Sequence, residues 1–175
     1  MIPRPDTETL VEVALELAPA GARVHDVGTG SGAVALALKH ERPDLSVSGS
    51  DASADAVEVA RENATRLGLD VPFSVADGLP AGEYDLVVAN LPYVREGEWE
   101  GLEPEIRLYE PREALVSGSD GLDAIRSLVA VAPAGALLAL EHAPDQAEAA
   151  RALLTGSRTV RDLAGRERVT VGRAP

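Results

Sequence analysis

The chain has 175 residues, of which 45% are hydrophobic and 26% are charged, as in one globular domain. This composition excludes a disordered, collagen-like or coiled-coil chain. The absence of Cys excludes disulfides and a Cys nucleophile, and three scattered His residues predict no metal site. The longest apolar run, 128–140, is interrupted by Pro133 and Gly135 and is shorter than the ~20 residues of a bilayer span. With no signal-peptide pattern at the N-terminus, we expect a cytoplasmic protein without a membrane partner.

The net charge is −13, from 29 acidic and 16 basic residues. A field of this sign repels phosphate backbones and anionic membranes. We therefore expect no tight direct binding to nucleic acid.

Apolar periodicity and capping residues predict helices that alternate with short strands. In chain order we expect a helix capped by Asp6 and running to Leu17, a strand at 23–27, a helix at 31–40, a strand at 47–50, a helix capped by Ser53 and ended by Gly68, strands at 71–75 and 84–89, an irregular acidic stretch at 95–111, a helix at 121–131, a strand at 136–141, a helix at 144–154 and a strand at 168–172. This alternation predicts a doubly wound α/β fold with a mainly parallel sheet and helices on both faces. Ligands of such sheets bind at the carboxyl ends of the strands.

A glycine-rich turn follows the first predicted strand, in the sequence His25-Asp26-Val27-Gly28-Thr29-Gly30-Ser31-Gly32. Alternate glycines permit positive φ and let a ligand lie against bare backbone at a helix N-terminus. The G-x-G-x-G spacing differs from the dinucleotide pattern G-x-G-x-x-G, and the carboxylate of Asp26 favours a cationic ligand over a pyrophosphate. S-adenosylmethionine combines cationic groups with an adenosine, and its candidate ligands in this turn are Asp26, Gly28, Thr29, Gly30, Ser31 and Gly32.

Two further acidic residues follow the next two strands. Asp51, beside Ala52, ends the second strand, where a carboxylate can accept both hydroxyls of a ribose. Asp77 follows the third strand and can accept from an exocyclic amine such as adenine N6, while Gly78 leaves room for the ring. We therefore assign Asp51, Ala52, Asp77 and Gly78 to the same cofactor site.

The sequence Asn90-Leu91-Pro92-Tyr93 follows the fourth strand in a chain with only 3% aromatic residues. The Asn90 amide can pair with a planar amide or amidine, the Leu91 carbonyl can accept its second N–H, and Tyr93 can cover its flat face. Such a site orients an NH₂ group toward an electrophile, and orientation supplies ~7–11 kcal/mol of barrier reduction in favourable cases. We predict catalytic roles for Asn90, Pro92 and Tyr93, substrate contacts for all four residues, and cofactor contact for Asn90.

These residues resemble the catalytic domain of the protein-(glutamine-N5) methyltransferases that modify peptide-chain release factors, the PrmC/HemK family. The resemblance covers nearly the whole chain and includes the segments 2–8, 28–32, 51, 90–93, 110–115, 120–122 and 166–173. The glycine turn and the Asn-x-Pro-Tyr turn specify an amino-methyltransferase, and the first and last segments narrow the class to glutamine.

The resemblance implies a class I S-adenosylmethionine-dependent methyltransferase fold, Rossmann-like, with seven strands of which the last is antiparallel. It also implies that Gly28 to Gly32, Asp51, Gly78 and Asn90 contact S-adenosylmethionine. Arg4 and the turn at 90–93 are then expected to hold the glutamine of a Gly-Gly-Gln loop in a release factor. The family usually carries an N-terminal helical domain, and because Met1 directly precedes the first matching segment we expect one catalytic domain over 1–175.

Three alternatives to a glutamine methyltransferase stay open. An adenine-N6 methyltransferase acting on RNA or DNA uses a similar turn, and Leu91 replaces the Pro most common in the glutamine family. Labelling of RNA by a methyl donor would identify that activity, although Lys39 is the chain's one lysine and no basic cluster accompanies it. A nicotinamide-dependent oxidoreductase leaves residues 90–93 without a role. A relic that binds the cofactor without turnover would show binding but no transfer.

Overall fold

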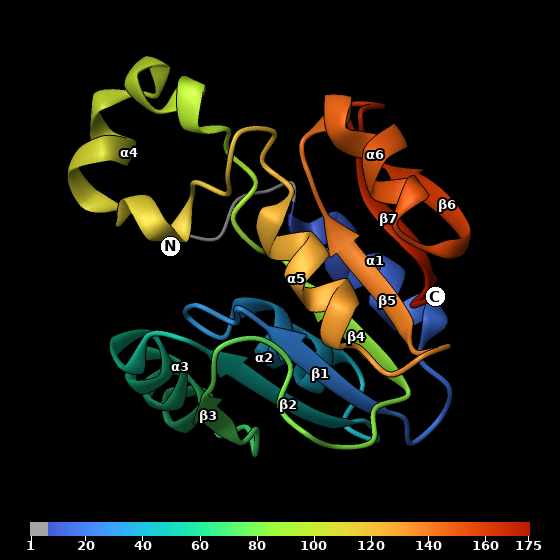
Figure 1. Cartoon of the computed structure of the whole chain (residues 1–175). Helices are drawn as coiled ribbons and strands as arrows, with labels where there is room; N and C mark the ends of the chain where they lie inside the picture. The colour runs from blue at the N-terminus through green and yellow to red at the C-terminus, as the bar shows by residue number, and fades with distance from the viewer. Residues whose placement is uncertain (1–6) are drawn as a thin grey trace.

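A computed structural model describes residues 7–175 of the chain as a seven-stranded sheet in the order β3-β2-β1-β4-β5-β7-β6 (Figure 1). The strands are β1 (Arg23–Val27), β2 (Ser46–Asp51), β3 (Phe73–Val75), β4 (Leu86–Ala89), β5 (Leu137–Glu141), β6 (Thr155–Arg161) and β7 (Glu167–Arg173). Strands β1 to β5 pair in parallel, and β7 is antiparallel to both neighbours. The mainly parallel α/β sheet and its antiparallel last strand are therefore confirmed.

Helices cover both faces of the sheet because the strand residues alternate between two cores. Leu86 and Val88 belong to one core with α1 (Thr7–Leu17), α2 (Ala33–Glu41) and α3 (Ala54–Leu67). Val87 and Ala89 belong to the other core with α5 (Asp123–Val131), which lies on the opposite side of the sheet in Figure 1. No helix within residues 7–175 combines the length and the apolar character needed to cross a bilayer.

Both predicted caps of α3 are confirmed. The Ser53 hydroxyl accepts a hydrogen bond from the Ala56 N–H at 3.3 Å. Gly68 ends the helix with φ +66°, and its N–H donates to the carbonyls of Ala64 and Thr65. These local interactions fix where α3 begins and ends, and so they fix the loop after β2 that carries part of the site. The helix cap predicted at Asp6 and the substrate contact predicted for Arg4 lie outside the described residues.

The sequence patterns do not predict one strand and three short helical segments. Strand β6 begins with Thr-Gly-Ser and lies at the sheet edge, so it lacks an alternating apolar face. The acidic stretch at 95–111, expected to be irregular, forms η1 (Glu96–Gly101) and α4 (Pro104–Tyr109), and η2 (Arg112–Ala114) directly follows it. The helix expected at 144–154 is shorter and consists of η3 (Pro144–Gln146) followed by α6 (Ala147–Ala152).

Candidate functional site

A cavity of about 660 Å³ opens at the carboxyl ends of the parallel strands, within the range of ~300–1,000 Å³ typical of small-molecule sites. Segments that follow β1, β2, β3 and β4 meet there, as the strand-end rule requires. Of the predicted site residues, the structure brings Asp26, Gly28, Thr29, Gly30, Ser31, Asp51, Ala52, Asp77, Gly78, Asn90, Leu91 and Pro92 to its wall. Gly32 and Tyr93 are not among the lining residues.

The glycine turn requires its glycines for two different reasons. Gly28, Gly30 and Gly32 have φ values of +70°, +55° and +81°, a region that L side chains rarely adopt. A Cβ built on Gly30 meets no atom within 4 Å, so the backbone faces open space in the cavity. A Cβ on Gly32 would lie 3.1 Å from Phe73 and 3.2 Å from Ala60, so this glycine allows α2 to pack closely against the core.

Asp51 is held in place by backbone groups on both sides of the cavity mouth. Its Oδ2 accepts the Gly30 N–H at 2.9 Å, and its Oδ1 accepts the Ser53 N–H at 2.9 Å. A carboxylate offers about four acceptor positions, so two remain for a ligand. The side chain is therefore an oriented acceptor that also fixes the glycine turn against the end of β2.

Asp26 lies deeper than a residue at the mouth of the cavity, because it is only 1% exposed. Its Oδ2 accepts the Thr29 hydroxyl at 2.6 Å. Burial raises the pKa of Asp26 to about 7, against the lowering effect of hydrogen bonds from Thr29 and the Ala35 N–H. The carboxyl therefore titrates near neutral pH at the floor of the cavity, and a nearby cation would stabilise its ionised form.

The segment after β3 forms the exposed rim of the cavity. Asp77 is exposed, and Gly78 adopts φ +84° with no atom within 4 Å of a built Cβ. The Gly78 carbonyl accepts a long hydrogen bond of 3.4 Å from the Ser50 hydroxyl at the end of β2. A flat ring can therefore approach the backbone at Gly78, beside the Asp77 carboxylate.

The side-chain amide of Asn90 donates a hydrogen bond through its nitrogen but accepts none at its oxygen from residues 7–175. Its Nδ2–H donates to the Thr7 hydroxyl at 3.0 Å, which joins the first turn of α1 to the end of β4. Its Oδ1 is buried, and no donor within residues 7–175 reaches it. Because a buried carbonyl oxygen without a hydrogen-bond partner is costly, this atom is the strongest indication that a ligand donates a hydrogen bond at the site.

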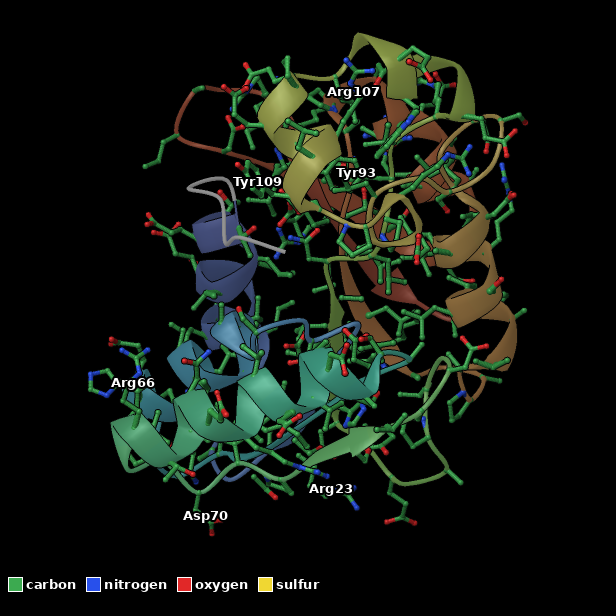
Figure 2. All side chains as sticks on the ribbon, turned by 90° about the vertical axis from the view of Figure 1, so that its left-hand side faces the viewer. Arg23, Arg66, Asp70, Tyr93, Arg107 and Tyr109 are labelled. Atoms are coloured by element: carbon green, nitrogen blue, oxygen red, sulfur yellow. The ribbon has the colours of Figure 1, made fainter. Side chains whose placement is uncertain are left out.

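The rest of the turn connects the glycine loop with the far side of the sheet. The Leu91 side chain lies so close to Gly28 that a Cβ there would be 2.7 Å from Leu91 Cδ2. The Tyr93 hydroxyl is 3.5 Å from Glu141 Oε1, and its backbone carbonyl accepts from Gln146. Figure 2 shows Tyr93 toward α4, whereas Arg23 at the start of β1 lies at the opposite end of the view. In this arrangement Tyr93 does not line the cavity.

Several functional candidates were not predicted from the sequence. Thr7 belongs to the matching segment 2–8 but carries no predicted role, and its hydrogen bond to Asn90 spans 83 positions. The cavity is also lined by residues of η2, of the segment before it and of α5: Pro111, Glu113, Ala114, Ala124, Ser127, Leu128 and Val131. The available signal is Val131, which lies outside the apolar face formed by Ile125, Leu128 and Val129 and is 60% exposed.

Comparisons with known proteins agree with this geometry. Residues 5–107 match the family model described as "Methyltransferase small domain". The chain is 46% identical to a release factor glutamine methyltransferase of Xylella fastidiosa (strain 9a5c), with 100% of this chain and 69% of that protein covered. It is 43% identical to the protein of the same name from Neisseria gonorrhoeae (strain ATCC 700825 / FA 1090), with 99% and 68% covered.

Among solved structures, the chain resembles a release factor-specific protein-(glutamine-N5) methyltransferase from Alicyclobacillus acidocaldarius. The two are 30% identical with a TM-score of 0.58, and the alignment covers 99% of this chain and 95% of that one.

Proposed function

The chain belongs to the family of release factor glutamine methyltransferases, and we propose that it methylates the N5 atom of a glutamine side chain. The proposed glutamine is that of the Gly-Gly-Gln loop of a peptide-chain release factor, and the proposed methyl donor is S-adenosylmethionine. When bound, the donor supplies a methyl group on a positively charged sulfur. The observation that carries the proposal is the buried Asn90 Oδ1, which accepts no hydrogen bond from residues 7–175.

The residues around the cavity fit this donor. Asp51 keeps two acceptor positions for the ribose hydroxyls, and Gly78 leaves space for the adenine ring beside Asp77. The bare backbone at Gly30 and the carboxyl of Asp26 provide room and negative charge for the cationic part. We assign these five residues, with Gly28, Thr29, Ser31 and Ala52, to binding of the donor, and Gly32 to the close packing of α2 that holds the turn.

We assign orientation of the glutamine amide to the turn at 90–93. The Asn90 Oδ1 and the Leu91 carbonyl accept the two N–H groups of the substrate, which holds its nitrogen toward the donor. Thr7 occupies an N–H of Asn90 and so leaves Oδ1 as the group presented to the substrate. No strong base is needed, because methyl transfer removes the positive charge from sulfur and the proton leaves the nitrogen afterwards.

The substrate side of this proposal is tested with short peptides. A peptide that contains Gly-Gly-Gln should accept the methyl group, and matched peptides that contain Gly-Gly-Glu or Gly-Gly-Ala should not, because they lack an NH₂ group for Asn90 and Leu91. Methyl incorporation is measured by mass spectrometry. Equal labelling of all three peptides, at a backbone or terminal site, would contradict the proposed recognition.

The charge of the chain supports a protein substrate over a nucleic acid. A net charge of −13 opposes phosphate backbones, which disfavours the adenine-N6 alternative. The proposed compartment is the cytoplasm, where a release factor would be met.

We expect binding of the donor to strengthen as the pH rises toward 7. Burial raises the pKa of Asp26 to about 7, so the free protein carries a proton there at lower pH. A bound cation favours the ionised carboxylate, so binding below pH 7 releases a proton. Between pH 5.5 and 7 the Kd should fall by about tenfold. Calorimetry in buffers of different ionisation enthalpy measures both effects, and Asp26→Asn should abolish the slope. The same slope in both proteins would assign the proton to another group.

We also expect Thr7→Val to slow methyl transfer by about tenfold with little change in donor affinity. Valine has nearly the shape of threonine but leaves the Asn90 Nδ2–H without its acceptor, at a cost of ~1–3 kcal/mol for a buried group. Thr7→Ser keeps the hydroxyl and should retain most of the activity. Single-turnover rates and calorimetry separate the two effects. Equal rates for the Val and Ser variants would show that the hydroxyl does not orient Asn90.

A further inference from the structure

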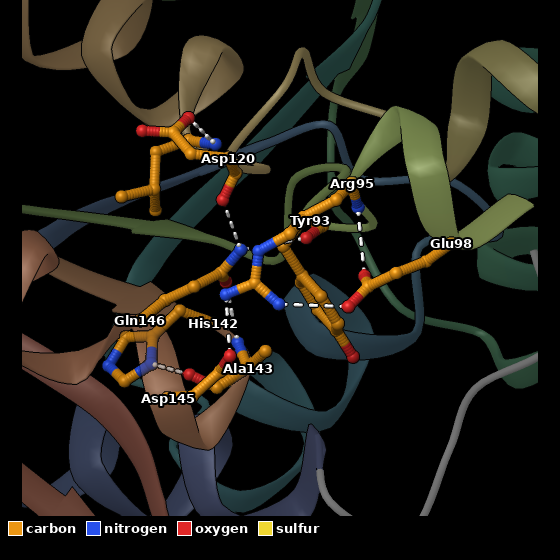
Figure 3. A network of polar contacts seen from close by, with 9 residues as sticks. Tyr93, Arg95, Glu98, Asp120, His142, Ala143, Asp145 and Gln146 are labelled. Atoms are coloured by element: carbon orange, nitrogen blue, oxygen red, sulfur yellow. Dashed lines mark hydrogen bonds and ion pairs between the residues drawn. The ribbon is translucent and has the colours of Figure 1, made fainter.

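Gln146 forms a buried hydrogen-bonded junction behind the turn at 90–93 (Figure 3). It is 2% exposed, at the end of η3. Its Nε2 donates to the carbonyls of Tyr93 and Asp120, each at 2.9 Å, and its Oε1 accepts the Ala143 N–H at 2.9 Å. Both N–H groups of the amide are therefore used. Tyr93 and Asp120 lie 53 and 26 positions before Gln146, whereas Ala143 lies three positions before it.

The space around this junction admits no extra atom. Gly121 follows Asp120 with φ +79°, and a Cβ built there would lie 2.2 Å from the Tyr93 carbonyl oxygen and 2.3 Å from Gln146 Nε2. Position 121 therefore requires glycine, because only glycine lets this turn contact both the Tyr93 peptide and the Gln146 amide.

The junction lies on the path between the substrate turn and a wall of the cavity. Tyr93 follows Pro92, whose ring fixes φ, so a shift of the Tyr93 peptide is passed on toward Asn90. On the other side, Gly121 leads into α5, which lines the cavity at Ser127 and Leu128. Gln146 thus ties the turn to the segment that follows β5.

We infer that Gln146 is a positioning residue that holds the Asn90-to-Tyr93 turn in its reactive geometry; this inference rests on the proposed function of that turn. It acts through the Tyr93 carbonyl and not by contact with the reacting atoms. Misplacement of a reacting group by about 1 Å can slow an enzyme 100-fold, so a loosened turn should affect the chemical step far more than donor binding.

The chain offers a matched control at the same junction. Asp145, next to Gln146, pairs with Arg95 at 2.5 Å across the same two segments, as Figure 3 also shows. Its side chain is 61% exposed, and an exposed ion pair contributes little to stability. Asp145→Ala therefore removes a surface link between the same segments while the buried amide stays in place.

The test compares Gln146→Met, which keeps the side-chain length but donates no hydrogen bond, with Asp145→Ala. We expect Gln146→Met to slow single-turnover methyl transfer by about 10-fold to 100-fold with less than about threefold change in the donor Kd. Asp145→Ala should leave both values unchanged. Ala150→Gly, at a fully buried position on α6, should lower the Tm without slowing transfer.

Hydrogen exchange in the absence of substrate provides a readout that is independent of activity. Peptides that cover 90–95 should exchange faster in Gln146→Met than in Asp145→Ala or the unmodified chain. A wild-type transfer rate in a folded Gln146→Met protein would overturn the inference. It would also be overturned if Ala150→Gly, at the same Tm as Gln146→Met, slowed transfer by the same factor. If the unmodified chain transfers no methyl group, the proposed function fails, while the exchange comparison still reports whether Gln146 holds the turn.

Discussion

Asn90→Ala is expected to reduce the single-turnover rate of methyl transfer by about 100-fold to 1,000-fold, the range found when one preorganised polar group is removed from an active site. The substitution deletes the buried Oδ1, which has no partner within residues 7–175 and is the proposed acceptor for the substrate N–H. It also leaves the Thr7 hydroxyl without its partner on the turn. The glycine loop and Asp51 are unaffected, so the donor Kd should rise only modestly.

A rapid-quench assay at saturating donor measures the rate, and calorimetry measures the Kd. Asn63→Ala is a suitable control, because Asn63 is also a partly buried amide but donates to the Ser31 carbonyl behind the glycine loop at 3.0 Å. That variant should weaken donor binding and leave transfer at saturation nearly intact. A normal turnover rate for Asn90→Ala would refute the role assigned to Asn90.

Asp51→Ala is expected to have the opposite effect, raising the donor Kd by about 100-fold with a smaller effect on transfer at saturation. Hydrogen bonds to a charged group contribute ~1.5–3 kcal/mol each, and a ribose would receive two of them from this carboxylate. The substitution also frees the Gly30 and Ser53 N–H groups, which loosens the glycine turn.

The ribose contribution is isolated with a ligand that lacks one hydroxyl. S-adenosylhomocysteine and its 2′-deoxy analogue should differ in affinity for the unmodified chain but bind Asp51→Ala with similar Kd values. If the unmodified chain does not discriminate between the two ligands, Asp51 does not contact the ribose, and its role is confined to holding Gly30 and Ser53.

The strand-end part of the site was predictable from the sequence. Because the first four strands are parallel, the residues that follow them must meet at one edge, and the cavity wall contains Gly28, Asp51, Gly78 and Asn90 together. The caps at Ser53 and Gly68 were predictable for a different reason, since they depend only on neighbouring residues. Local sequence and one topological rule were sufficient for these features.

Other features depend on contacts between distant segments and leave no local pattern. Strand β6 is stabilised by its pairing with β7 at the sheet edge and not by an apolar face of its own. The bonds from Thr7 to Asn90 and from Gln146 to Tyr93 join residues 83 and 53 positions apart. The burial of Asp26 is not predicted because a carboxylate near the end of a strand suggests exposure, whereas the Thr29 hydroxyl and the core around β1 enclose it.

The most direct test of the proposed function is to incubate the chain with a methyl-labelled donor, a release factor and ribosomal RNA in one mixture, and to map the label by mass spectrometry. We expect one methyl group on the side-chain nitrogen of the glutamine in the Gly-Gly-Gln loop, and no label in the RNA. Label on adenine in the RNA, or on the release factor at a residue other than that glutamine, would contradict it.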